Sequence, residues 1–153
     1  MLGRLCTEVA NGGFGPDHRL FPLTGEGRTA VRTYRSEYGG PDRSEAGPDR
    51  GRPGDDRPAA HWPRGVLPIL DRGCGMYAAV DCLRPDAPVL LFEPNAGPRD
   101  WARAWFLDAP SPAHWLEAWL SGTGWWEEDV MPAQDAAEPQ PWPDAARRLR
   151  PHS

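Results

Sequence analysis

The sequence has no lysine, so all 17 basic residues are arginine, and no apolar run approaches the roughly 18 residues of a membrane-spanning helix. The first twenty residues also lack the apolar stretch of a secretory signal. Three cysteines in 153 residues are too few for a disulfide scaffold. A formal net charge of −5 excludes the basic footprint of a nucleic-acid binder. We therefore expect a cytoplasmic protein with reduced thiols that contacts neither nucleic acid nor membrane.

Glycine, proline and tryptophan are in excess, with 17, 19 and 8 residues respectively. Their distribution divides the chain, because residues 61–131 hold seven of the eight tryptophans. The same range holds ten acidic residues and five arginines, whereas residues 1–60 and 132–153 are each neutral. The sequence therefore predicts a folded, acidic core at 61–131.

The remaining segments are expected to contribute less to the core. Residues 1–34 should form an N-terminal helix, an Asn-Gly-Gly turn and a first short strand. Residues 35–60 contain one aromatic residue and no aliphatic residue larger than alanine, so they cannot bury enough apolar surface to offset their ordering entropy. We expect a flexible linker there and a disordered tail at 132–153.

Short apolar runs at 66–70, 76–82 and 89–92 lie about ten residues apart, which is typical of an antiparallel meander. A fourth strand is expected at 102–107. The predicted fold class is α+β, with a small, mostly antiparallel sheet of about four to six strands. Helices should pack on this sheet, one of them closing the domain, and long flexible segments should surround it.

A helix is expected after this meander, beginning at Ser111-Pro112 with a hydroxyl cap and a proline in its first turn. Two glycines, Gly122 and Gly124, should end it. Its apolar residues recur at helical spacing and should lie on the sheet. They are Trp115, Leu116, Trp119 and Leu120. Trp101 and Trp105 are likewise expected to be core residues.

Few residues in the sequence indicate a metal, phosphate-binding or catalytic site. Cys74 and Cys82 do not form the close pairs typical of zinc ligands, and no histidine pair accompanies them, so we expect no metal or cofactor. The glycine-rich stretch beginning at Asn11 has no lysine to complete a phosphate-binding loop. A thiol nucleophile at Cys74 would need a positioned histidine, and none is close in sequence. Structural roles are therefore favoured for both cysteines.

The pair Trp125-Trp126 precedes three acidic residues, Glu127, Glu128 and Asp129. A charge run is usually a solvated face. Exposed tryptophan beside charge is, however, typical of binding hot spots. Core packing and partner binding stay open as equal alternatives here, and these five residues are the candidate interface.

Four motifs in order make the chain resemble a known family, the SUKH superfamily of Smi/Knr-type proteins. The resemblance covers about residues 8–25 and 64–123. Its motif residues are Asn11, Gly12 and Gly13 in a turn, Gly73 and Cys74 in a hairpin, Asp81 at a strand end, Pro94 and Asn95 in a turn, and Trp105, Trp115 and Trp119 in the closing strand and helix. The chain departs from the family in having only ten residues before Asn11, so we expect a shortened N-terminal part. Glu93 also stands where the family more usually has aspartate.

The resemblance implies an α+β binding domain without catalytic residues. Many bacterial members of the family are immunity proteins, which bind a cognate polymorphic toxin, often a nuclease, and block it. The negative charge suits a basic partner, because charge complementarity speeds association. We therefore expect an immunity-type protein that binds a basic toxin domain, its oligomeric state being open. The alternatives are an intracellular regulatory or scaffold module and, less favoured, a thiol or hydrolytic enzyme built around Cys74 and Asp81.

Overall fold

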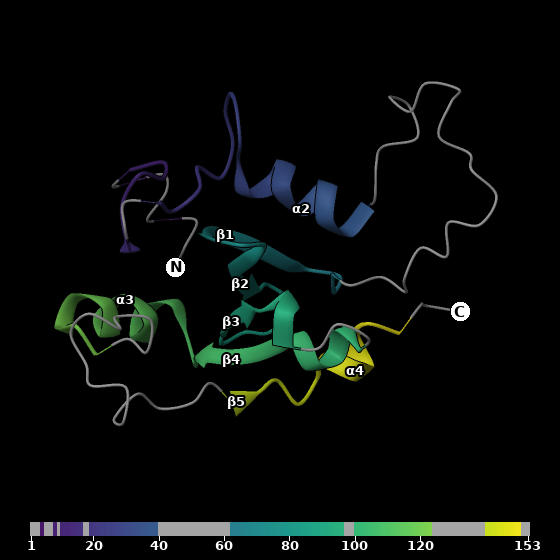
Figure 1. Cartoon of the computed structure of the whole chain (residues 1–153). Coiled ribbons are helices and arrows are strands. Elements are labelled where there is room, and N and C mark those ends of the chain that lie inside the picture. Colours follow the sequence, from purple (N-terminus) through teal and green to yellow (C-terminus); the bar gives the residue numbers. More distant parts are fainter. Residues whose placement is uncertain are drawn as a thin grey trace, which may run out of the picture.

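The computed structural model describes residues 4, 8, 10–16, 19–39, 62–96, 100–123 and 140–150 (Figure 1). Within these ranges it has a five-stranded antiparallel sheet and flanking helices, which confirms the predicted α+β class. The strands are β1 (Val66–Gly73), β2 (Met76–Asp81), β3 (Val89–Phe92), β4 (Trp105–Ala109) and β5 (Gln140–Pro141). The helices are α2 (Ala30–Gly39), α3 (Pro112–Ser121) and α4 (Ala145–Arg148). Among the described residues, no helix combines the length and apolar character needed to span a bilayer.

The strands follow one another in sequence order across the sheet, as a meander does. The three apolar runs become β1, β2 and β3 as predicted, with β1 extending to Gly73. Because side chains alternate across a strand, Tyr77 and Ala79 enter one apolar cluster while Ala78 and Val80 enter another. Both faces of the central strands are therefore covered.

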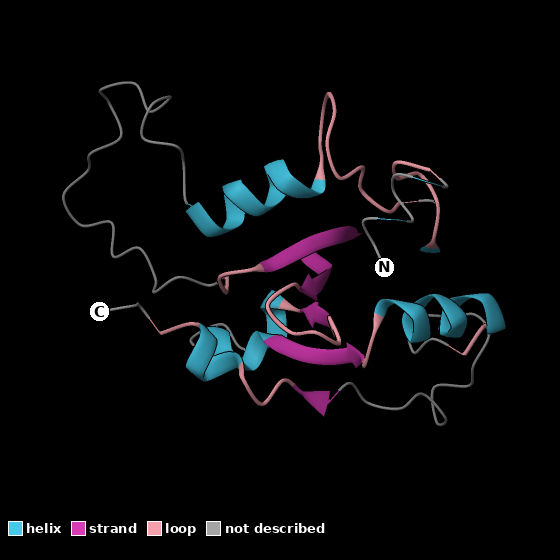
Figure 2. Cartoon of the chain, turned by 180° about the vertical axis from the view of Figure 1, so that it is seen from behind, coloured by secondary structure: helices cyan, strands magenta, loops and turns pink. Residues whose placement is uncertain are grey.

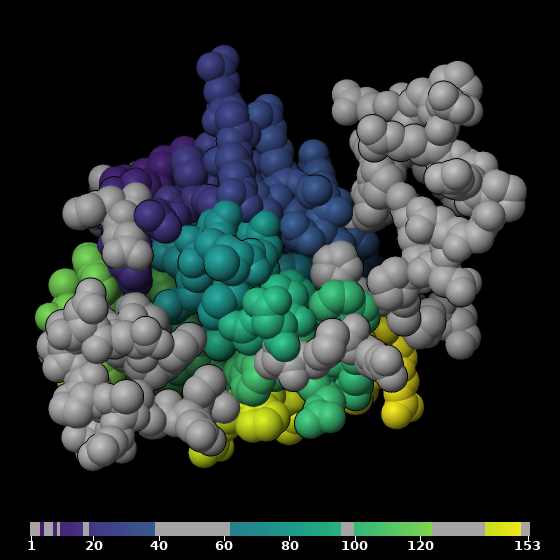
Figure 3. All heavy atoms as spheres, viewed as in Figure 1, coloured from purple at the N-terminus to yellow at the C-terminus, as the bar shows by residue number. Residues whose placement is uncertain are grey.

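The first cluster is aromatic, and it joins segments that are far apart in sequence. The ring of Trp62 lies 4.9 Å from that of Trp105 and 5.3 Å from that of Phe92, measured between centroids. Tyr34 of α2 and Ala145 of α4 contribute to this cluster. Helix α2 lies beside β1 at one edge of the sheet, and α4 lies toward the other edge, that of β4 and β5 (Figures 1 and 2). In the space-filling view, the α2 residues lie above the strands and the C-terminal residues below them (Figure 3).

Helix α3 begins and ends where the sequence predicted. The Ser111 hydroxyl accepts a hydrogen bond from the backbone N–H of His114 at 3.3 Å, and Pro112 occupies the first turn. Gly122 ends the helix in the left-handed conformation, with φ of 66°. The expected apolar face is only partly used, because Trp115 is buried whereas Leu120 is 75 % exposed. Trp115 and Leu116 pack on the second apolar cluster, which includes residues of β1, β2 and β3, and the helix follows directly after the end of β4.

Two strand predictions need correction. The expected strand at 102–107 begins only at Trp105, because the carboxylate of Asp100 accepts a hydrogen bond from the Ala102 N–H at 3.0 Å and caps a 3₁₀ turn, Trp101–Ala104. The expected first strand is reduced to one bridge between Leu20 and Leu70. Most of the expected N-terminal helix lies outside the described residues.

The prediction of a disordered tail at 132–153 is wrong for residues 140–150. This segment adds β5 and α4, and Trp142 is only 5 % exposed. The backbone N–H of Trp142 donates to the carbonyl of Trp105 at 2.9 Å, and this hydrogen bond holds the segment on the sheet.

The linker prediction at 35–60 also fails at its start, because α2 continues to Gly39. The Thr29 hydroxyl caps α2 by accepting from the Arg32 N–H at 3.2 Å. Residues 40–61 lie outside the described ranges.

Candidate functional site

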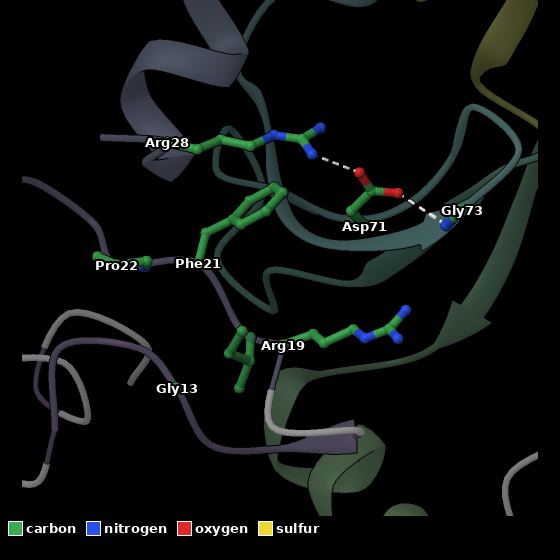
Figure 4. Close-up of a pocket in the computed structure, with 8 residues that line it drawn as sticks. Gly13, Arg19, Phe21, Pro22, Arg28, Asp71 and Gly73 are labelled. Carbon is green, nitrogen blue, oxygen red and sulfur yellow. Dashed lines mark hydrogen bonds and ion pairs between the residues drawn. The ribbon is translucent and has the colours of Figure 1, made fainter. Parts of the chain in front are cut away.

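An open hollow of about 540 Å³ lies between the Asn11-Gly12-Gly13 turn and the end of β1 (Figure 4). The hollow is broadly open to solvent, so it is a shallow surface site and not an enclosed cavity. The hollow combines apolar walls with three ionisable side chains. Its lining residues are Gly13, Arg19, Leu20, Phe21, Pro22, Arg28, Asp71 and Gly73.

The turn at one side of the hollow consists of Asn11, Gly12 and Gly13. The side-chain carbonyl of Asn11 accepts a hydrogen bond from the Leu23 N–H at 2.9 Å, and its amide donates to the Thr24 carbonyl at 2.9 Å. Gly12 has φ of +84°, and a Cβ there would lie 2.4 Å from the Pro22 nitrogen. The Gly13 N–H donates to the Leu20 carbonyl at 2.9 Å. Asn11, Gly12 and Gly13 therefore hold residues 20–24 in place.

The Arg28 guanidinium is held in position by four groups. It forms an ion pair with Asp71 and donates to the Tyr77 hydroxyl at 2.8 Å. It also lies over the Phe21 ring, 4.9 Å from its centroid, and over the Tyr77 ring at 5.7 Å. Burial raises the pKa of the Tyr77 hydroxyl, and the Glu37 carboxylate, 3.4 Å away, raises it further against the opposing effect of Arg28. The neutral phenol is therefore the form present near neutral pH.

The charge of the hollow is positive on balance. Both oxygens of the Asp71 carboxylate are engaged, one by Arg28 and the other by the Gly73 N–H at 2.7 Å. Arg19 is exposed and extends along the other side of the hollow (Figure 4). It forms no ion pair with any other described residue. The hollow thus contains two guanidinium groups and one carboxylate. Asp71 balances the charge of Arg28, and the charge of Arg19 is left over.

Asp81 is placed at the end of β2, fully buried, where it holds the C-terminal segment. Two nitrogens of Arg148 each donate to the Asp81 carboxylate at 3.0 Å, which is a bidentate pair. The Leu83 N–H donates to the same carboxylate at 3.1 Å. Arg148 also donates to the Arg64 carbonyl at 2.7 Å. Asp81 is therefore a structural anchor.

The structure does not bring Cys74 and Asp81 together, because they flank opposite ends of β2. Cys74 is exposed in the hairpin turn, with φ of 51° between glycines. The pKa of the Cys82 thiol is raised by its partial removal from water and by the adjacent Asp81 carboxylate, and the raised pKa lowers the reactivity of the thiol.

The contact of 2.8 Å between the Ser111 hydroxyl and the His114 ring belongs to the helix cap. Within the described ranges, no three side chains of His, Cys, Asp or Glu are grouped as a metal site requires.

The remaining residues of the sequence motifs contribute to a turn and to the packing of tryptophan side chains. The backbone and side-chain N–H groups of Asn95 both donate to the Glu93 carboxylate at 3.0 Å, which closes the turn containing Pro94. Trp105 and Trp115 are core residues as predicted, whereas Trp119 and Trp101 are half-buried. The Trp115 indole donates to Asp108 at 2.9 Å, and Arg72 lies 3.3 Å from the same carboxylate.

The candidate interface at Trp125, Trp126, Glu127, Glu128 and Asp129 lies outside the described residues. The described ranges hold nearly equal numbers of acidic and arginine residues, so the excess negative charge belongs to the other ranges. Within 61–131, the described residues still hold seven acidic residues and four arginines, and the arginines of the other described ranges balance them. The C-terminal residue Arg148 pairs with Asp81, so this buried carboxylate adds no net charge to the surface of the core.

Arg19, Arg28 and Asp71 were missed as site residues in the sequence analysis. Arg28 and Asp71 are 43 residues apart, and no motif links them, so only the fold brings them together. Comparison of the chain with models of known protein families, with curated proteins and with solved structures found no match.

Proposed function

We propose that this chain is a protein-binding domain of the immunity type, which neutralises a partner toxin by direct binding. The observation that carries the proposal is the open hollow beside Arg28. A guanidinium that is fixed by an aromatic ring and a carboxylate is pre-organised, and pre-organised arginine is typical of protein interfaces. The hollow is formed by the same turn and hairpin on which the SUKH resemblance rests.

The use of the other polar groups also supports binding over catalysis. Asp81 and Asp108 have side chains with no exposed surface, and each is engaged by an arginine. A general acid or base must reach its substrate, and neither carboxylate is accessible to one. Cys74, the one motif thiol, has no described histidine beside it.

The partner in this proposal is a protein with an excess of basic charge. The net charge of −5 favours encounter with such a partner. The excess negative charge lies largely outside the described ranges, for example at Glu127, Glu128 and Asp129. These residues attract the partner at long range, while the hollow provides a fixed contact point.

The test is co-expression of the whole chain with a toxin domain encoded beside its gene. Growth of cells carrying both proteins, together with recovery of a complex by affinity capture of the tagged chain, is the expected result. Failure of both protection and complex formation would contradict the proposal. A control co-expression with a toxin domain from an unrelated gene pair should not be protected, because immunity is specific. Recovery of housekeeping proteins without any toxin would instead support the regulatory or scaffold alternative.

A further inference from the structure

We infer that the hollow receives an acidic side chain of the partner, flanked by an apolar residue, with its carboxylate between Arg19 and Arg28. The inference deepens the proposed function and rests on it for the identity of the partner. Its chemical content, recognition of a carboxylate beside an apolar group, depends only on the hollow itself.

The first reason is the unused hydrogen-bonding capacity of the two guanidinium groups. A guanidinium carries five N–H donors, of which Arg28 commits one to Asp71 and one to the Tyr77 hydroxyl. Arg19 commits none of its donors to another described residue. Arginine forms short, bidentate hydrogen bonds with carboxylates, so both groups are chemically matched to that ligand.

The second reason is the net charge of the hollow, which is one positive unit after the pair between Arg28 and Asp71 is discounted. A single carboxylate neutralises this charge. Asp71, whose position is fixed by the Gly73 N–H at 2.7 Å, repels a phosphate dianion more strongly than a singly charged carboxylate, because the repulsion grows with the charge of the ligand. The charge balance of the hollow therefore favours a carboxylate over a phosphate dianion.

The third reason is the apolar side of the hollow, formed by Leu20, Phe21 and Pro22. Phe21 is half-buried, and Arg28 covers its ring at 4.9 Å from the centroid. An apolar residue next to the bound carboxylate would lie on this wall and remove it from water, which stabilises the complex. In Figure 4 the Phe21 ring and the two guanidinium groups lie around one space, with the Gly73 end of β1 beyond it.

The direct test is an NMR titration of the full ¹⁵N-labelled chain with the capped peptide acetyl-Leu-Asp-Leu-amide. We expect saturable shifts at the amides of Gly13, Phe21 and Gly73. The matched peptide with asparagine in place of aspartate should bind about tenfold more weakly or worse, as loss of a charge-assisted hydrogen bond predicts. Equal binding of both peptides, or the absence of saturable shifts, would overturn the inference. Inorganic phosphate causing the same shifts at the same concentration would show a small-anion site and would also overturn it.

Arg19→Gln is the matched variant, because Arg19 is exposed and its replacement leaves the core intact. It should weaken binding of the aspartate peptide about tenfold, while Arg35→Gln, at an exposed position on α2, should leave binding unchanged. The growth assay separates the two claims. If the chain protects cells and Arg19→Gln protects them equally well, the hollow is wrongly assigned and the proposed function stands. If the unaltered chain fails to protect, the proposed function fails, and the peptide titration alone decides the chemistry of the hollow.

Discussion

Replacing Arg148 with alanine should sharply destabilise the fold. The Asp81 side chain has no exposed surface and that of Arg148 is 13 % exposed, so the pair is shielded from water. The change removes two hydrogen bonds of 3.0 Å to Asp81 and one of 2.7 Å to the Arg64 carbonyl. It also removes the cation that lies 5.6 Å from the Trp142 ring centroid. Breaking a buried pair by deleting one partner costs about 3–5 kcal/mol, because a charge is left uncompensated.

Urea unfolding followed by tryptophan fluorescence measures this loss, and Arg147→Ala is the matched control. The Arg147 side chain is 69 % exposed and pairs with Asp144 on the surface, so its loss should change the unfolding free energy by less than about 0.5 kcal/mol. The double variant Asp81→Asn/Arg148→Met removes both charges and should recover at least about half of the lost stability. A loss below about 1 kcal/mol for Arg148→Ala, or one equal to the control, would show that the Asp81–Arg148 pair does not stabilise the fold.

Three further predictions concern the core, the helix cap and the pH dependence. Trp142→Ala should lower the unfolding free energy by about 3–5 kcal/mol, measured in urea, because a buried indole is lost from the aromatic cluster. Ser111→Ala should lower it by about 0.5–2 kcal/mol through loss of the α3 cap, while Ser111→Asp, which retains a capping oxygen, should be nearly neutral. Stability should fall as the pH rises through about 10, where Tyr77 ionises in the unfolded chain before it does in the folded one. Tyr77→Phe should reduce that fall, whereas Tyr38→Phe, at an exposed position, should not.

Local chemistry explains which elements were predictable from sequence. The ends of α3 depend on Ser111, Pro112 and Gly122, whose capping geometry involves neighbours within a few residues. Strands β1, β2 and β3 are continuous apolar runs, because both faces of the central sheet are covered. The start of β4 was misplaced, since the Asp100 cap turns the preceding residues into a 3₁₀ turn that the apolar pattern does not reveal.

Long-range pairing explains what was missed. The segment 140–150 resembles a polar tail in composition, and it is ordered by contacts of Arg148 with Asp81, 67 residues away, and of Trp142 with Trp105. Residues 30–39 show no clear apolar periodicity, yet the Thr29 cap and the contacts of Tyr34 with the aromatic cluster make them helical. The hollow depends on Arg28 meeting Asp71 across the fold, which no local pattern encodes.

In the proposed function, this chain neutralises a toxin by binding it directly. Isothermal titration calorimetry of the purified chain against the catalytically inactive toxin domain encoded beside its gene measures that binding. We expect saturable binding with a 1:1 stoichiometry and an affinity that falls as salt is raised, since charge complementarity contributes to the encounter. An absence of heat and of complex formation at micromolar concentrations of both proteins would contradict it.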